Sequence, residues 1–547
     1  MAHKTEIGKD ILEMLMFSLY PEAETIYREY LQNATDSIRE ACDTGVLDSM
    51  EDGHISIRIN PSQHSVVIQD NGIGISAEYA ERTLKDIAKT TKRKKDYLAG
   101  YYGIGRLVGA GYCRRLIFET SAKGESLESR IVFDVDKIRA ILEDEDNDMG
   151  ASEVIDAVTA FSQCPVDEED HFFRVSLNDI LVDYPELLDE TAIRDYLKQV
   201  APIDYLAEFK NSLIKPSISE NGEDFLLRYN SMSRVKVSLN DYVDIRKPYG
   251  LRIDGTDDQI YGLRFFTIIS DKRESLAWGW YAITEFSTQI PDRDPNNNNF
   301  VLTRGMRLRI HNIQIGNQNF FDGTEYFKQA RSNKYFNGEI HIIHPRIKPT
   351  TDRSDLAPTA EALEFKEKIR AFFNYEMQDV YQTANKVKKQ LEKYQSATNI
   401  LTTCHSTDSS IPGHSASSMV PGISKAYEDQ SKASEEIHKQ LDAPRAQKPG
   451  VKAMLNVYQQ KMNQIREEAE ANMLEGPSAP YGSGKNDMPI PKPTATEEME
   501  AMTSKYGSEG VGMLKKVFTL IDRHTPTRSK EIVSSIKSAV LNDLKNE

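Results

Sequence analysis

Three polar side chains lie on one stripe of a predicted helix near the N-terminus. Glu29, Asn33 and Asp36 stand at positions i, i+4 and i+7 of IYREYLQNATDSI (26–38), a spacing that places them on one helical face. A carboxamide oxygen can hold a magnesium ion, and a carboxylate one turn away can orient and deprotonate a water molecule. The pattern therefore favours metal-assisted hydrolysis, although the polar face of an amphipathic helix has the same spacing.

A second motif is a strand that ends in an aspartate. In VVIQDNGIGI (66–75), Asp70 closes the predicted strand, and Gly72 and Gly74 follow it. A carboxylate at a strand end can accept a hydrogen bond from the exocyclic amine of a base, and the glycines permit a close approach of the backbone. An ordinary Asn-Gly hairpin turn would give the same letters.

The third motif is the glycine-rich segment AGYYGIGRLVGAGY (99–112). Gly100, Gly103 and Gly105 precede a helix-compatible stretch, and backbone N–H groups at such a turn can cradle phosphate. No Gly-Lys-Ser/Thr follows, so the segment is not a Walker A loop. A lysine-rich, helix-like segment precedes it where a dinucleotide-binding fingerprint needs a strand, which excludes that motif as well.

The three motifs occur together and in this order, a combination that resembles the Bergerat ATP-binding fold of the GHKL superfamily (gyrase, heat-shock chaperone, histidine kinase, MutL). Two segments, SLYPEAETIYREYLQNATDSI (18–38) and DIAKTTKRK (86–94), are similar to the heat shock protein 90 family of chaperones. The resemblance implies an ATPase that binds ATP and Mg²⁺.

The resemblance also implies roles for single residues. Glu29 would be the general base, Asn33 the magnesium ligand and Asp70 the partner of adenine. Gly72 and Gly74 would lie beside the base. Gly100, Gly103 and Gly105 would form the phosphate-side hinge of an ATP lid over about 76–105. Lys89, Thr90 and Thr91 would contact phosphate or ribose. A solvated loop is the alternative for the lysine cluster at 89–95.

One position departs from the family's pattern. The family usually carries a threonine on a late strand near the adenine, whereas the best candidate strand here, HFFRVSL (171–177), offers Phe173 at that place. Either the adenine contact is made differently or this strand is misaligned, so we assign it no site residue.

A fourth motif lies far along the chain, in EIHIIHPRIKPTTDRSDL (339–356). It resembles the loop by which the middle domain of such chaperones brings a basic residue to the γ-phosphate of ATP. Arg353 is the first candidate and Lys348 the second, because a cation there neutralises charge that develops during phosphoryl transfer. An exposed arginine paired with Asp352 or Asp355 is the alternative.

The elements that must position these motifs form an α+β chain. We expect an N-terminal Bergerat α/β sandwich, a middle α/β transducer domain and a helical C-terminal region. Strands are expected at 54–70 (a hairpin), 114–120, 129–135, 170–177, 262–270, 276–286, 306–315 and 338–344. The expected domains are 1–205, 206–357 and 358–475, the last beginning with a long helix at 358–396 and holding a flexible loop at 398–422, then a linker at 476–496 and a small helical domain at 497–547.

Composition limits the class of protein. The 547 residues carry a net charge of −16, which disfavours a bulk electrostatic grip on nucleic acid. The four cysteines, Cys42, Cys113, Cys164 and Cys404, show no metal-ligand or disulfide spacing, so a reducing cytoplasm fits. No apolar run reaches the roughly 18 residues that a membrane span requires, and we expect no membrane partner.

Three functions remain open. The resemblance implies a homodimer whose N-domains close on ATP like a clamp and act on protein clients or partner proteins. A MutL- or MORC-like clamp on DNA, in repair or defence, is the first alternative, and DNA-stimulated turnover would distinguish it. The second is a scaffold that binds nucleotide without turnover, and the presence of Glu29 counts against it.

Overall fold

The computed structural model describes residues 7–18, 22–87, 105–408 and 416–474. The described residues belong to one compact unit of the chain, Met1–Pro477. The linker expected at 476–496 and the helical domain expected at 497–547 lie outside the described residues. The compact unit contains two β-sheets and many helices, which confirms the expected α+β class.

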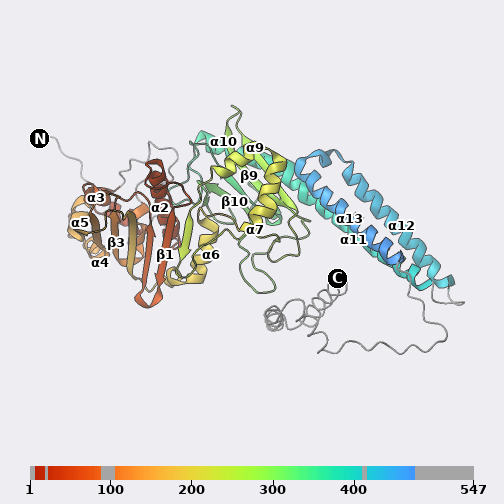
Figure 1. The fold of residues 1–547 in the computed structure, drawn as a ribbon, viewed down its shortest axis with the longest axis horizontal. Helices are drawn as coiled ribbons and strands as arrows, with labels where there is room; N and C mark the ends of the chain where they lie inside the picture. The colour runs from red at the N-terminus through yellow and green to blue at the C-terminus, as the bar shows by residue number, and fades with distance from the viewer. Residues whose placement is uncertain (1–6, 19–21, 88–104, 409–415, 475–547) are drawn as a thin grey trace, which may run out of the picture. The chain divides into compact units, whose positions relative to one another are not determined.

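The N-terminal sheet has seven strands in the order β5-β4-β3-β6-β2-β1-β7 (Figure 1). All neighbours are antiparallel except β1 and β7, which are parallel. The strands are β1 His54–Asn60, β2 Ser65–Asp70, β3 Cys113–Ser121, β4 Leu127–Asp134, β5 Thr159–Pro165, β6 Phe172–Ile180 and β7 Lys236–Leu239. The last strand, β7, belongs to the segment that the sequence assigns to the middle domain. Parallel strands need a long crossover connection, and the chain between β1 and β7 provides one.

The expected hairpin at 54–70 is confirmed. Its turn forms because the Asn60 side chain accepts a hydrogen bond from the Gln63 N–H at 3.1 Å and His64 adopts a left-handed φ of 48°. Alternate residues of β2, including Val66 and Ile68, are buried on one face.

Helices cover this buried face of the sheet. Helix α2 packs on β1 and β2 and is buried along much of its length, and α4 packs on β3. Each fully buried aliphatic side chain in this core contributes about 1.5–3 kcal/mol. The helices of this region are α1 Asp10–Glu13, α2 Thr25–Asp43, α3 Ala80–Lys85, α4 Val135–Glu143, α5 Ala151–Val158 and α6 Glu190–Val200.

The second sheet has five strands in the order β11-β10-β12-β9-β8. They are β8 Gly262–Ile269, β9 Ser275–Ile283, β10 Gly305–Ile310, β11 Ile313–Ile315 and β12 Asn337–Ile342, and the short helices α7 Ala207–Phe209, α8 Lys215–Asn221 and α9 Glu223–Asn230 precede them. Both tryptophans of β9 are core residues, with exposed fractions of 2% for Trp278 and 1% for Trp280.

The single strand expected at 306–315 is wrong in one respect. His311 and Asn312 have φ angles of 51° and 65°, so the segment folds back as a tight hairpin between β10 and β11. Positive φ at both central residues matches the twist of a two-residue hairpin, and asparagine tolerates it better than most residues. The turn therefore interrupts an otherwise continuous apolar alternation.

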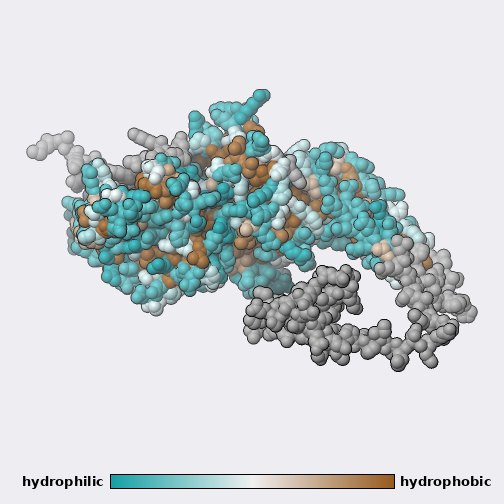
Figure 2. Space-filling model, viewed as in Figure 1, coloured by the Kyte–Doolittle hydropathy of each residue, from teal (hydrophilic) through white to brown (hydrophobic). Residues whose placement is uncertain are grey.

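Four helices follow the second sheet: α10 Ala360–Phe372, α11 Gln378–Asp408, α12 Ala416–Leu441 and α13 Pro449–Leu474. Helix α11 packs against both α12 and α13 (Figure 1). The long helix expected at 358–396 is interrupted at Phe373–Met377 by a π-helical turn. Figure 2 shows a mostly hydrophilic visible face with scattered apolar patches.

The flexible loop expected at 398–422 is wrong for most of its length. Residues up to Asp408 continue α11, and α12 begins at Ala416. The threonines that suggested a loop are accommodated within the helix, because Thr398, Thr402 and Thr403 each donate a hydrogen bond to the carbonyl four residues earlier. Such bonds satisfy a hydroxyl without leaving the helix.

Candidate functional site

Helix α2 presents the first predicted group of site residues. Glu29 and Asp36 are buried, with exposed fractions of 5% and 2%, and Asn33 is half-buried between them. A buried carboxylate is expensive unless partners compensate it, and Glu29 has such a partner in Arg353. Asn33 is the member of the group that remains open to a ligand.

Asp70 ends β2 beside α2, as the strand pattern predicted. Its exposed fraction is 3%, and its Oδ1 accepts a hydrogen bond from the Gly72 N–H at 2.8 Å. The next residue, Ile73, donates its N–H to the Ser37 carbonyl at 3.1 Å. The backbone after the strand therefore lies directly against the helix that carries Glu29.

Glycine is required at both positions after this strand. A Cβ at Gly72 would lie 2.1 Å from Ser37 Oγ, and one at Gly74 would lie 1.9 Å from the Ser121 carbonyl oxygen. Gly74 also has a φ of +68°, which L-residues with a side chain rarely adopt. The two glycines thus keep backbone close to backbone at the end of the sheet.

The strand that carries Phe173 does lie next to Asp70. Phe173 pairs directly with Asp70 on one side and with Thr120 on the other. Directly paired residues project from the same face of a sheet, so the half-buried Phe173 ring shares the face of the Asp70 carboxylate.

A threonine is present on this face, but on β3. The Thr120 Oγ1 accepts a hydrogen bond from the Ile75 N–H and donates one to the Phe172 carbonyl, both at 2.9 Å. Thr120 therefore holds the glycine turn to the sheet. Sequence reasoning missed it because only strand pairing places Thr120 and Asp70 on either side of Phe173.

The glycine-rich motif is described from Gly105 onward. Gly105–Gly111 forms a 3-10 helix that is tied to α2, because the Tyr30 hydroxyl accepts from the Gly109 N–H at 3.0 Å and donates to the Arg106 carbonyl at 2.9 Å. The predicted contacts Lys89, Thr90, Thr91, Gly100 and Gly103 lie outside the described residues.

Arg106 is a second residue that the sequence motif did not single out. Its Nε and Nη2 atoms are buried, and neither has a hydrogen-bond partner in the described part of the chain. Burial lowers the pKa of the guanidinium to about 10, so it stays charged at neutral pH. The charge of Asp86 opposes this effect of burial, and the two buried donors are available to an anionic ligand.

The loop 349–356 brings Arg353 to this site. Its ends are joined by a bridge between Pro349 and Leu356, and the Thr350 N–H donates to the Asp355 carbonyl at 2.8 Å. Arg353 is 4% exposed and has a left-handed φ of 59°. A strained backbone at a buried arginine is typical of functional sites.

Arg353 and Glu29 form a buried ion pair. The Arg353 Nε donates to the Glu29 Oε1 at 2.7 Å, and the neighbouring Arg28 donates from Nη2 to the Asp352 carbonyl at 2.8 Å. The two partners of the ion pair are 324 positions apart in sequence. Helix α2 and the loop after β12 are therefore joined at the residue predicted to be the general base.

The alternative partners of Arg353 have contacts of their own. The Asp352 Oδ1 accepts from the Thr350 hydroxyl at 2.6 Å, and Asp355 pairs with Lys366 at 2.7 Å. Lys348, the second candidate, is half-buried in the segment just before this loop. The alternative, an exposed Arg353 paired with Asp352 or Asp355, would leave the arginine open to solvent. The structure instead buries Arg353 against Glu29.

Comparisons with known proteins concern the N-terminal part of the chain. Residues 22–162 match the family described as histidine kinase-, DNA gyrase B-, and HSP90-like ATPases. The chain is similar to the chaperone protein HtpG of Legionella pneumophila (strain Lens), with 36% identity over 121 residues, and of Buchnera aphidicola subsp. Acyrthosiphon pisum (strain APS), with 27% over 155 residues. These matches span 19% and 25% of the relatives and 19% and 23% of this chain, so they cover only about a quarter of either protein at most.

Proposed function

Because residues 22–162 form a GHKL-type ATPase domain with similarity to heat shock protein 90-like chaperones, we propose that the chain binds and hydrolyses ATP as a chaperone-like molecular clamp. The observation that carries the proposal is the buried contact of Glu29 with Arg353. A catalytic base and a cation supplied by another region of the chain are the two groups that hydrolysis of a phosphoanhydride needs most.

The described residues suit a nucleotide. The close backbone approach at Gly72 and Gly74 leaves the Asp70 carboxylate at the end of a flat, glycine-lined turn. The buried Arg106 donors provide a charge partner for phosphate. In this proposal Asp70 accepts a hydrogen bond from the exocyclic amine of adenine, Phe173 covers the same face, and Arg106 binds a phosphate oxygen.

The residues also suit a magnesium ion. The half-buried Asn33 carboxamide lies one turn after Glu29, and hard cations prefer such oxygen ligands. A Mg²⁺ ion at Asn33 would neutralise phosphate charge.

Glu29 and Arg353 would act in sequence. While they are paired, the Glu29 Oε1 accepts a hydrogen bond from the Arg353 guanidinium. When Arg353 turns to the negative charge on the terminal phosphate, the Glu29 carboxylate is free to accept a proton from the attacking water. The water then attacks the γ-phosphorus of ATP, the β–γ phosphoanhydride bond breaks with ADP as the leaving group, and the product is inorganic phosphate.

The larger organisation is proposed from the resemblance. The N-terminal domain (1–205) would close on ATP, the middle domain (206–357) would supply Arg353, and the helical region from 358 onward would take part in a homodimer acting on protein clients in the cytoplasm. Within the described residues, no helix is long and apolar enough to cross a membrane.

Steady-state ATP hydrolysis tests the proposal. The purified protein is compared with Glu29→Ala in the presence of magnesium and with a chelator, and ATP binding is measured separately. Removal of the base should lower the rate by about 10²–10⁴-fold while binding persists. Equal inactivity of both proteins with intact ATP binding would favour the scaffold, and absence of ATP binding would reject the nucleotide site itself.

A further inference from the structure

A cavity of about 480 Å³ lies where α2 meets the middle region. We call it the Arg39 pocket, after the residue that α2 contributes to it. Arg228 of α9, Trp278 of β9, His311 of the β10–β11 turn and His341 of β12 also line it. Its volume is within the usual range for small-molecule sites.

The ionisable side chains that line the Arg39 pocket are all basic. The lining includes two arginines and three histidines but no aspartate or glutamate, in a chain whose net charge is −16. The contacts seen for Arg228 are with neutral groups, namely the hydroxyls of Thr267 and Ser275, each at 3.3 Å, and the ring of Phe225. The pocket is therefore a locally cationic site in an acidic protein.

One wall of the pocket is apolar and aromatic. The Trp278 and His341 rings stack with centroids 4.7 Å apart and planes inclined by 15°. Ile310, Ile342 and Ile347 line the same cavity. A ligand that fits both walls has an apolar body, preferably a flat one, and an acidic group.

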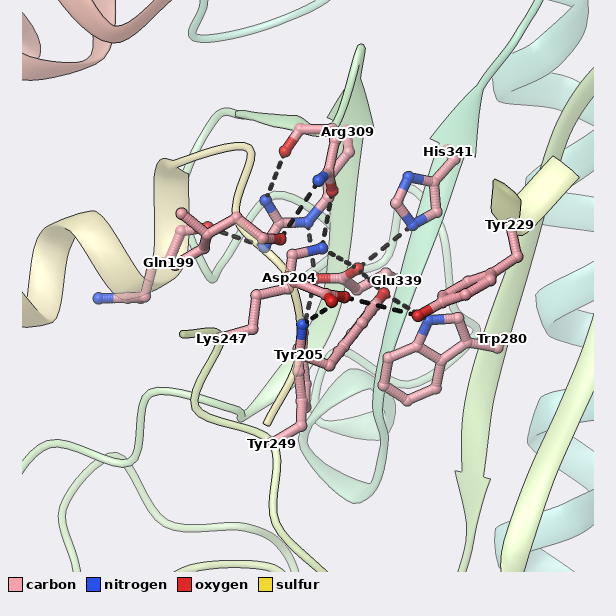
Figure 3. Close-up of polar contacts among 12 residues, drawn as sticks. Gln199, Asp204, Tyr205, Tyr229, Lys247, Tyr249, Trp280, Arg309, Glu339 and His341 are labelled. Carbon is pink, nitrogen blue, oxygen red and sulfur yellow. Dashed lines mark hydrogen bonds and ion pairs between the residues drawn. The ribbon is translucent and has the colours of Figure 1, made fainter. Parts of the chain in front are cut away.

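A carboxylate stands near each histidine of the pocket: Asp36 for His311, Glu339 for His341 and Glu274 for His344. His341 Nε2 lies 3.2 Å from Glu339 Oε2 and His344 Nε2 lies 3.6 Å from Glu274. Figure 3 shows that Glu339 belongs to a buried network, in which it pairs with Lys247 at 2.7 Å and with Arg309 at 2.6 Å. The negative charge of Glu339 is thus already compensated within the core.

Burial keeps two of the histidines neutral. It lowers the pKa of His311 and of His341 to about 4, against the opposing effects of Asp36 and Glu339 respectively. At pH 7 the positive charge of the pocket therefore comes from Arg39 and Arg228, and the imidazoles offer hydrogen bonds rather than charge.

We infer that the Arg39 pocket is a binding site for a small organic acid, one with a carboxylate or phosphate group held by Arg39 and Arg228 and an apolar, aromatic body packed against the wall that the stacked His341 and Trp278 rings and the isoleucines form. The site is separate from the proposed ATP site, which uses Asp70 and Glu29. It borders α2 through Arg39 and the segment leading to Arg353 through His344 and Ile347, so a bound acid touches both elements that carry the ion pair.

Tryptophan fluorescence tests the inference, because Trp278 and Trp280 are the chain's two tryptophans. The full chain is titrated with benzoate and phenyl phosphate, and with benzyl alcohol as the neutral counterpart. We expect a saturable change for both acids and at least about tenfold weaker binding of the alcohol. Trp278→Phe, which leaves Trp280, should abolish most of the signal.

Substitutions of single arginines test whether Arg39 holds the acidic group of the ligand. Arg39→Gln should weaken benzoate binding about tenfold, whereas Arg58→Gln, which removes an exposed arginine from β1, should leave it unchanged. Matching melting temperatures of the two variants exclude misfolding as the cause. Asp70→Asn should remove ATP binding without affecting benzoate, which separates this site from the nucleotide site.

Three results would overturn the inference. These are no saturable binding of either acid, equal binding of benzyl alcohol, and unchanged benzoate binding in Arg39→Gln. Phenyl phosphate that binds and is displaced by ATP, with no binding of benzoate, would place the anion in the nucleotide site and would also reject the Arg39 pocket.

Discussion

Gly74 follows β2 with a φ of +68°, and a Cβ there would lie 1.9 Å from the Ser121 carbonyl oxygen. Gly45 offers a matched contrast, because its φ is +76° and a Cβ there would meet nothing within 4 Å. The two glycines share the conformational requirement, and only Gly74 has the close backbone neighbour.

We predict that Gly74→Ala lowers the free energy of unfolding by at least about 2 kcal/mol more than Gly45→Ala. A left-handed residue with a side chain costs about 1–2 kcal/mol at either site, and the backbone must shift only at Gly74. Urea unfolding followed by circular dichroism measures both. Equal losses would show that the contact with Ser121 is relieved at little cost.

The candidate site shows what residue spacing can and cannot reveal. Glu29, Asn33 and Asp70 were found because their spacing places them at defined positions of a helix and a strand, and because the three motifs together resemble those of the GHKL superfamily. Thr120 and Arg106 were not found, because their roles depend on sheet pairing and on a local absence of acceptors. Arg353 was expected from a motif, and its partner Glu29 becomes visible only in three dimensions.

At the scale of elements, strands with strong alternation were predictable. The hairpin at 54–70 and the strand at 262–270 lie where the apolar pattern placed them. The helices over 398–408 and 416–422 were missed because Ser, Thr and Gly suggest a loop, whereas packing of α11 on α12 overrides that local preference. The membership of β7 in the first sheet was not foreseeable from local pattern, because it depends on a long-range parallel pair.

The middle sheet contains the most highly charged part of the core. Glu339 of β12 has an exposed fraction of 0% and pairs with Lys247 and Arg309 (Figure 3). Arg309 also donates to the Gln199 carbonyl at the end of α6, at 2.8 Å. The network therefore joins the second sheet to α6.

We predict that Glu339→Gln is strongly destabilising, by about 3–5 kcal/mol, because it leaves two buried cations without their counter-charge. The urea unfolding midpoint measures the effect. The control is Glu428→Gln, which removes a carboxylate from an exposed pair with Lys432 on α12 and should leave the midpoint unchanged. If both variants unfold at the wild-type midpoint, the ion pairs of Glu339 do not contribute to the stability of the second sheet.

At the scale of the molecule, two residues 324 positions apart, Glu29 and Arg353, meet at one site. Hydrolysis would therefore depend on the contact between α2 and the loop that carries Arg353. The curated relatives support only the ATPase region, and the dimer is our proposal. We predict that light scattering coupled to gel filtration gives a mass of twice the chain's 62.0 kDa. A mass of 62.0 kDa at all concentrations and with ATP present would exclude a dimeric clamp.

The central claim is that Glu29 and Arg353 work together on one ATP molecule. The measurement that tests it most directly is kcat for Glu29→Ala, Arg353→Ala and the double variant, with melting temperatures and ATP affinity as controls. Each single change should lower kcat by about 10²-fold or more. The double variant should be no more than about threefold slower than the slower single, because groups that act as a unit are not additive. Wild-type kcat in Arg353→Ala, or losses that multiply in the double variant, would contradict the account.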